Sequence, residues 1–149
     1  MKKILLGIAV ALISALAVSA QSSELVSKII KSEKATLAQI SYLPALYANR
    51  ITEEDSEEKA FQVMQESGLF SEEATPDTEA TLADVCFVYA KSLGLKGGLF
   101  YRLFQSPRYA FKEFKAQGII PAEADPSMKL SGIDSMDLFS TLTSEGEEE

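Results

Sequence analysis

Apolar residues recur every three or four positions through most of this chain, and Gly, Pro or acidic residues separate the runs. This spacing places apolar side chains on one face of a helix, as Leu25, Val26, Ile29 and Ile30 do near the start. The same pattern predicts helices within residues 22–34, 35–48, 51–68, 80–94, 105–118 and 130–144. No stretch alternates convincingly as a strand would, although the short sequences GLF and GII could pair briefly. The chain is therefore predicted to be all-α.

Residues typical of helix boundaries flank these runs. Each predicted helix has a candidate N-cap whose hydroxyl can bind a free amide of the first turn: Ser22 or Ser23, Thr36, Thr52, Thr81, Ser106 and Ser131. Gly68, Gly94 and Gly118 stand just after predicted helices, where the backbone needs the left-handed conformation that Gly adopts readily. Pro44 is expected to kink its helix or end it early, because proline lacks the amide hydrogen.

Two segments resemble each other without gaps at a spacing of 50 residues: 59–84 and 109–134. Their Gly, Pro and capping positions fall in register, and residues 35–46 match residues 80–91 at a spacing of 45. Each unit has a helix, a Gly stop, an acidic loop, a cap and a second helix, and its apolar stripe needs a neighbouring unit for burial. We predict a helical bundle of about three degenerate helix-loop-helix repeats. The alternative is chance similarity between helical sequences.

The first 20 residues have the features of a secretory signal peptide. A basic start, MKK, precedes the apolar residues 4–18, and the small side chains of Val18 and Ala20 suit cleavage after Ala20. An uncleaved anchor is the alternative, although the apolar run is shorter than the roughly 20 residues that cross a bilayer. No second long apolar run exists, so no stable membrane span is expected in the mature chain. The predicted organisation is a signal peptide (1–20), a helical-repeat domain (21–142) and a disordered acidic tail (143–149).

Composition excludes several classes of function. Cleavage after residue 20 removes two of the 14 basic residues and none of the 22 acidic ones, which leaves a net charge of −10 and argues against nucleic-acid binding. The chain contains no His, so Ser-His and Cys-His nucleophiles and His-ligated zinc sites are excluded. Cys86 is the only cysteine. Its apolar neighbours predict a buried side chain, and a reactive or intermolecular thiol is the alternative.

The acidic side chains do not indicate a catalytic or metal site. Capping and solvation account for those in helix first turns and in loops, and no spacing supports a hydrolase with paired carboxylates. Residues 125–134 could offer oxygen ligands to calcium, but they lack the ordered spacing of a calcium loop. We therefore predict no enzyme activity, no cofactor and no metal site.

One segment departs from the acidic balance: residues 91–115 contain six basic, one acidic and six aromatic residues. A short helix there cannot bury all its apolar residues on one side, so some should stay at the surface. Aromatic residues next to Arg are typical of interface hot spots, and a positive patch attracts acidic partners. The predicted partner-binding residues are Lys96, Phe100, Tyr101, Arg102, Phe104 and Arg108. The alternative is structural: the aromatic residues belong to the core, and the basic side chains interact favourably with helix dipoles and nearby acidic residues.

The order AF, Gly-apolar-apolar, Pro and Thr/Ser-x-x-Asp resembles the tandem S-layer homology unit, a family of helix-loop-helix repeats that binds cell-wall polymers. The motif that contains Arg in that family reads TLAQ at Thr36, TLAD at Thr81 and SGID at Ser131, so polymer binding is not implied here. The stretch LKGGLFYRLFQSPRYAFKE from Leu95 is similar to segments of small exported helical-repeat proteins of spirochaetes. That resemblance covers about residues 35–142 and implies location and fold rather than an activity.

These observations predict an exported, non-enzymatic interaction or scaffold protein of the bacterial periplasm or cell envelope. Its partner is expected to be an envelope protein or another acidic partner. The alternative is a carrier that holds a lipid or another apolar ligand between its helices. A cavity lined by Phe and Leu near Gly97 would favour that alternative. The sequence does not determine the oligomeric state.

Overall fold

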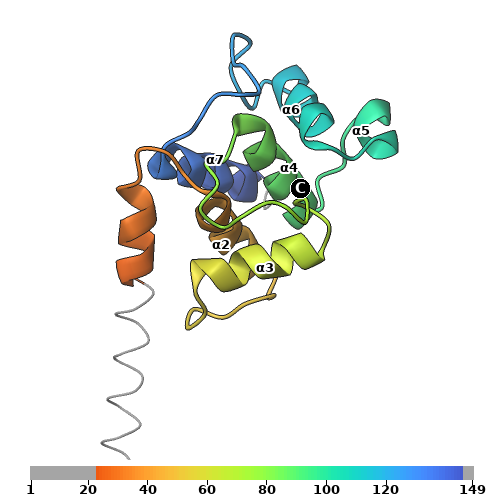
Figure 1. Cartoon of the computed structure of the whole chain (residues 1–149). Helices are drawn as coiled ribbons and strands as arrows, with labels where there is room; N and C mark the ends of the chain where they lie inside the picture. Colours follow the sequence, from red (N-terminus) through yellow and green to blue (C-terminus); the bar gives the residue numbers. More distant parts are fainter. Residues whose placement is uncertain (1–22, 146–149) are drawn as a thin grey trace, which may run out of the picture.

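The structure, a computed structural model, describes residues 23–145, which form a bundle of helices (Figure 1). Residues 23–30 are helical, and the helices that follow are α2 (Leu37–Tyr47), α3 (Glu57–Glu66), α4 (Leu82–Ser92), α5 (Leu99–Leu103), α6 (Pro107–Ala116) and α7 (Gly132–Glu145). The described part contains no strand, and its isolated bridges join Thr36 to Glu79 and Thr81 to Lys129 rather than the GLF and GII segments. The prediction of an all-α helical bundle is confirmed.

Most helices begin at the predicted caps. Thr36 and Thr81 each form a capping box, in which the cap hydroxyl accepts a bond from the amide three residues on and the cap amide donates to that residue's side chain. The Ser131 hydroxyl accepts the equivalent amide bond before α7. Ser106 occupies the N-cap position of α6 with Pro107 in the first turn, but its side chain makes no capping bond. Local sequence therefore determines where these helices start.

Helices α3, α4 and α6 end at the predicted glycines. Gly68, Gly94 and Gly118 have φ values of 76°, 63° and 73°, and each amide donates to a carbonyl of the last helical turn. Asn49, with φ of 54°, ends α2 in the same way, since Asn tolerates the left-handed conformation better than most residues. Asn49 is not among the predicted helix stops.

The N-cap prediction for Thr52 is wrong, and so is an early end of α2 at Pro44. Thr52 does not cap α3: it bonds to Asp55 in a separate turn, and Ser56 caps the helix by accepting the amide bond three residues on. Pro44 does not end α2, which continues to Tyr47. Pro44 is fully buried, so packing in the core outweighs the loss of one helical hydrogen bond.

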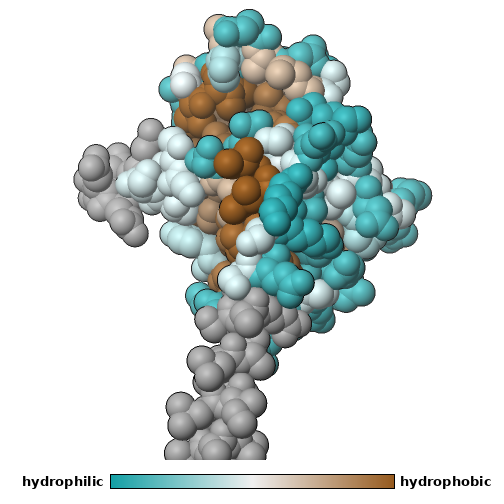
Figure 2. Space-filling view, turned by 90° about the vertical axis from the view of Figure 1, so that its left-hand side faces the viewer, coloured by the Kyte–Doolittle hydropathy of each residue, from teal (hydrophilic) through white to brown (hydrophobic). Residues whose placement is uncertain are grey.

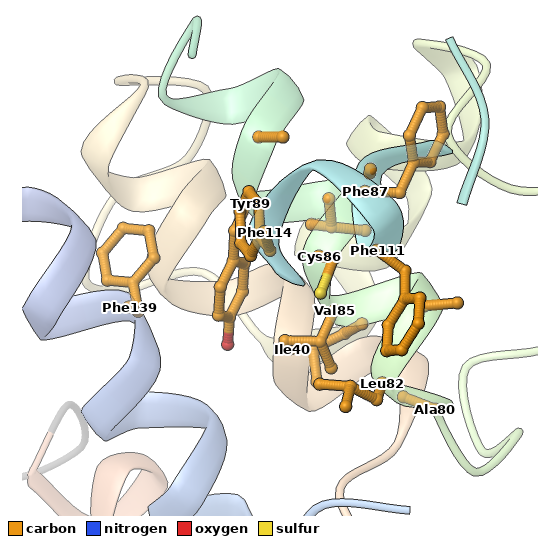
Figure 3. Packing of buried hydrophobic residues seen from close by; sticks show 14 of the residues in the cluster. Ile40, Ala80, Leu82, Val85, Cys86, Phe87, Tyr89, Phe111, Phe114 and Phe139 are labelled. Atoms are coloured by element: carbon orange, nitrogen blue, oxygen red, sulfur yellow. The ribbon is translucent and has the colours of Figure 1, made fainter. Parts of the chain in front are cut away.

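Helix α4 is the centre of the core. Eight of its 11 residues are buried, as expected for a helix that is apolar on nearly all sides. It packs against α2 and α6, and Figure 3 shows Phe111 and Phe114 of α6 beside it. Phe139 of α7 contacts Tyr89 edge to face at 5.2 Å between ring centroids. Cys86 is fully buried here, as predicted.

Two loops bind the starts of earlier helices through matching hydrogen bonds. The amides of the first two residues of α2 donate to the carbonyls of Thr78 (2.8 Å) and Pro76 (3.1 Å). The corresponding amides of α4 donate to the carbonyls of Met128 (2.7 Å) and Pro126 (3.1 Å). The loop after α3 and the loop after α6 thus hold the starts of α2 and α4 in the same manner.

The helix at residues 23–30 lies against both α3 and the start of α7. Lys28 forms an ion pair with Glu57 of α3, and Ile29 is buried. The amide of Gly132, the first residue of α7, donates to the Ser32 carbonyl at 2.8 Å. Figure 2, which views this side of the molecule, shows hydrophobic residues at the surface beside hydrophilic ones.

The ends of the described part bear on two predictions. Helix α7 continues to Glu145, three residues beyond the predicted domain boundary at residue 142. The predicted signal peptide, with cleavage after Ala20, and residues 146–149 lie outside the described residues. Among the described helices, none is both long and apolar enough to cross a membrane.

Candidate functional site

Most of the predicted partner-binding residues lie on or beside α5, which projects at one edge of the bundle (Figure 1). This five-residue helix begins after Gly98 without a side-chain cap and packs on α6. Four large apolar side chains of α5 and its C-cap remain largely in solvent: Leu99 (67% exposed), Phe100 (65%), Leu103 (64%) and Phe104 (54%). We refer to these four residues as the α5 ledge.

Helical spacing explains why the ledge is continuous. Leu99 and Leu103 are four residues apart, as are Phe100 and Phe104, so the two pairs share one face of the helix. Tyr109 of α6 supports this face from behind. Its ring stacks with Phe104 at 5.4 Å and with Phe100 at 6.5 Å between centroids. The ledge is therefore a row of apolar side chains in contact with the bundle only along one edge.

Tyr101 does not belong to the exposed surface, contrary to its predicted role in partner binding. It points towards the bundle and is only 5% exposed. A Cβ at Gly97 would lie 2.5 Å from the Tyr101 ring, so the chain passes close to the ring at this point. Burial, together with the charge of Glu113, raises the pKa of Tyr101. Tyr101 is the residue that anchors α5 to the rest of the fold.

The three predicted basic contact residues lie within four residues of the ledge along the chain. Lys96, Arg102 and Arg108 are all exposed. The ion pairs found in residues 23–145 join other segments, and none involves these three side chains. No carboxylate of the described chain therefore pairs with these bases, and of the structural alternative only the helix-dipole contact applies, to Arg102 in the last turn of α5.

The structural alternative does account for the remainder of the basic segment. Phe111 and Phe114 are buried in the core. Lys115 donates to the Ala124 carbonyl at 3.1 Å, and its ammonium lies 5.6 Å from the Phe111 ring centroid. The Lys112 ammonium lies 5.5 Å from the Tyr109 ring centroid. The aromatic and basic segment thus divides into a structural half on α6 and an exposed half on and around α5.

Depressions lie on both sides of Tyr101. One of about 330 Å³ lies between α5 and α6 and is lined by Phe100, Tyr109 and Lys112 among others. Another, of about 470 Å³, includes Gly97, Leu95 and the charged Lys96 and Arg102, and no Phe lines it. The depression at Gly97 is therefore not the Phe and Leu cavity that would favour an apolar-ligand carrier, and the carrier stays an untested alternative.

The other candidate groups have local roles. Burial raises the pKa of the Cys86 thiol to about 12, so this cysteine stays protonated and unreactive at neutral pH. Asp125, in the segment weighed as a calcium loop, accepts hydrogen bonds from the side chain and backbone of Ser127, which lower its pKa. Within residues 23–145, no three Cys or acidic side chains converge as metal ligands would.

Leu99 and Leu103 are exposed members of the ledge that the predicted set of contact residues omitted. Their spacing of four residues, matched by Phe100 and Phe104, could have identified them. The same periodicity places Tyr101 nearly opposite Leu99 and Leu103 but close to Phe104 around the helix, so spacing alone does not predict that Tyr101 points inward. Compared with family models, curated proteins and solved structures, the chain matches none.

Proposed function

We propose that the protein is an exported, non-enzymatic interaction or scaffold protein of the cell envelope, which docks on an acidic partner through the α5 ledge. One observation carries the proposal: four large apolar side chains, each more than half exposed, lie together beside three exposed bases. Grouped exposed apolar residues mark interaction sites in folded proteins. The bases Lys96, Arg102 and Arg108 favour a partner of negative charge.

The helical frame supports a scaffold role. The first amides of α2 and α4 donate matching pairs of hydrogen bonds to loop carbonyls, and the first amide of α7 donates to the Ser32 carbonyl, just after helix 23–30. We take these as three degenerate units, of which the third is completed by the N-terminal helix. Joining the two ends of the domain in this way would give a closed frame that presents α5 rigidly.

The envelope location rests on the sequence of residues 1–20, which has a basic start, an apolar run and a small-residue cleavage site. A chain without disulfides must keep its fold outside the cytoplasm by packing alone. The buried α4 and the capped helix ends supply that packing.

A pull-down from envelope extract tests the docking surface. The variant combines Arg102→Glu with Arg108→Glu, and the matched control combines Lys31→Glu with Arg50→Glu, which changes net charge equally at exposed positions elsewhere. We expect the ledge variant to lose the partner that the wild type and the control retain, with all three melting at the same temperature. Equal recovery by both variants would contradict the proposal, and so would unfolding of the ledge variant, because these bases would then be structural.

A further inference from the structure

We infer that the acidic partner is the surface of an anionic lipid bilayer, into which the α5 ledge inserts. The inference rests on the docking function proposed above and names the partner of the same surface. It follows from the shape of the ledge, from its charge and from the charge of the rest of the chain.

The apolar part of the ledge suits the boundary between headgroups and acyl chains. Leu and Phe side chains on one face of a surface helix are what interfacial membrane helices bury there. Here the face is presented by a helix at the edge of the fold, with Tyr101 anchoring its inner side. The four side chains can therefore enter the interface without any change in the bundle.

The charges fit an anionic surface and orient the protein on it. Lys96, Arg102 and Arg108 lie around the apolar face without ion pairs in the described part, as bases do where they meet lipid phosphates. Outside residues 91–115 the mature chain carries six basic and 21 acidic residues. An anionic bilayer repels that remainder, so only the ledge side can approach closely.

A bilayer fits the ledge better than a folded protein does. Four side chains that expose somewhat over half their surface offer on the order of 500 Å² of apolar contact, if a large side chain has about 200 Å². A standard protein interface buries about 800 Å² on each partner, with complementary shape. The ledge projects at the edge of the bundle, with Phe100 beside the depression between α5 and α6, and a lipid surface requires no complementary shape.

Vesicle binding tests the inference. The protein beginning at Gln21 is used, because the apolar residues 4–18 would themselves insert into lipid. Vesicles of phosphatidylglycerol mixed with phosphatidylcholine are compared with vesicles of phosphatidylcholine alone in co-sedimentation. We expect at least about tenfold tighter binding to the anionic vesicles, because each base near such a surface contributes about fivefold. The preference should weaken as salt is raised.

Two variants separate the apolar and the electrostatic contributions. Leu99→Ser with Leu103→Ser, at positions already exposed, and Arg102→Glu with Arg108→Glu should each weaken anionic-vesicle binding by about tenfold or more. The control pair Lys31→Glu with Arg50→Glu should bind within about threefold of wild type, since these residues lie outside the ledge. Equal binding by the ledge variants and the control would overturn the inference.

Fluorescence locates the insertion. The chain has no Trp, so Phe100→Trp introduces a single indole into the ledge, and Tyr47→Trp is an exposed control outside it. We expect the fluorescence emission of the indole to shift to shorter wavelength and to be quenched by brominated lipid at position 100 but not at position 47. An unshifted indole at position 100 overturns the inference.

The outcome for lipid can be separated from the outcome for docking. If a photo-crosslinker at position 100 captures an envelope protein while vesicles leave the indole unshifted, lipid insertion is refuted and the docking function stands. If neither vesicles nor envelope extract retain the protein, both are refuted.

Discussion

Replacement of Gly132 by Ala tests how the N-terminal helix closes the bundle. A Cβ at this position would lie 1.7 Å from the Ile29 carbonyl oxygen and 2.7 Å from its carbon. The obstacle is backbone, so helix 23–30 must move away from α7. Without this contact Ala would stabilise a helix by about 0.5–1 kcal/mol relative to Gly. The sign of the change in unfolding free energy therefore tests whether the contact exists.

The cost can be worked out from what the movement disrupts. Ile29 is 1% exposed, and its return to water costs about 1.5–3 kcal/mol. Loss of the 2.8 Å bond from Gly132 to Ser32 costs about 1 kcal/mol more. With the helix preference of Ala subtracted, we expect a net destabilisation of about 1.5–3.5 kcal/mol, a substantial part of the 5–15 kcal/mol typical of a domain.

Urea unfolding measures this loss, and hydrogen exchange locates it. The Ala35 amide, which donates to the Leu130 carbonyl at 2.8 Å beside the altered contact, should lose protection, whereas amides of α4 should lose protection only as global stability falls. Gly98→Ala is the control, because its Cβ would meet only the flexible Glu113 carboxylate at 3.1 Å. An unchanged or higher stability of Gly132→Ala would refute the docking of helix 23–30 on α7.

Four further predictions concern single features. Thr81→Ala should cost about 1–2 kcal/mol in thermal unfolding, because it removes a capping box. Ser106→Ala should cost only about 0.3 kcal/mol, since its side chain makes no capping bond. Equal losses of stability in the two variants would contradict this reasoning. Burial raises the pKa of Cys86 to about 12. The unfolded thiol ionises near pH 8.5, so the contribution of this group to stability should fall as pH rises from about 9 to 12. Thiol reagents should therefore label Cys86 only after unfolding, and rapid labelling of the native protein would refute its burial. Tyr101→Phe should leave the melting temperature unchanged or raise it slightly, because the buried hydroxyl has no partner in the described part. N-terminal sequencing of the protein purified from its own cells should begin at Gln21, and an intact leader would refute cleavage after residue 20.

The helix starts and stops could be predicted from the sequence because they depend on atoms a few residues apart. The hydroxyls of Thr36 and Thr81 bind amides of their own first turns, and Gly68 and Gly118 adopt the left-handed conformation that L-residues avoid. These interactions arise wherever such segments become helical. The prediction for Thr52 is wrong because its hydroxyl bonds to Asp55, and Ser56 caps α3 instead.

The sequence by itself determined an all-α chain with most of its helix boundaries, and it indicated the segment where aromatic and basic residues gather. Only the tertiary structure decided which of those residues face water. Tyr101 is buried and Phe100 exposed because α6 covers one side of α5 and Gly97 lets the chain pass close to the tyrosine ring. Likewise, burial keeps Pro44 inside a continuous helix, and the place of helix 23–30 depends on Gly132, about 100 residues away. The physical reason is that caps and turns form within one segment, whereas exposure depends on which distant segment covers a side chain.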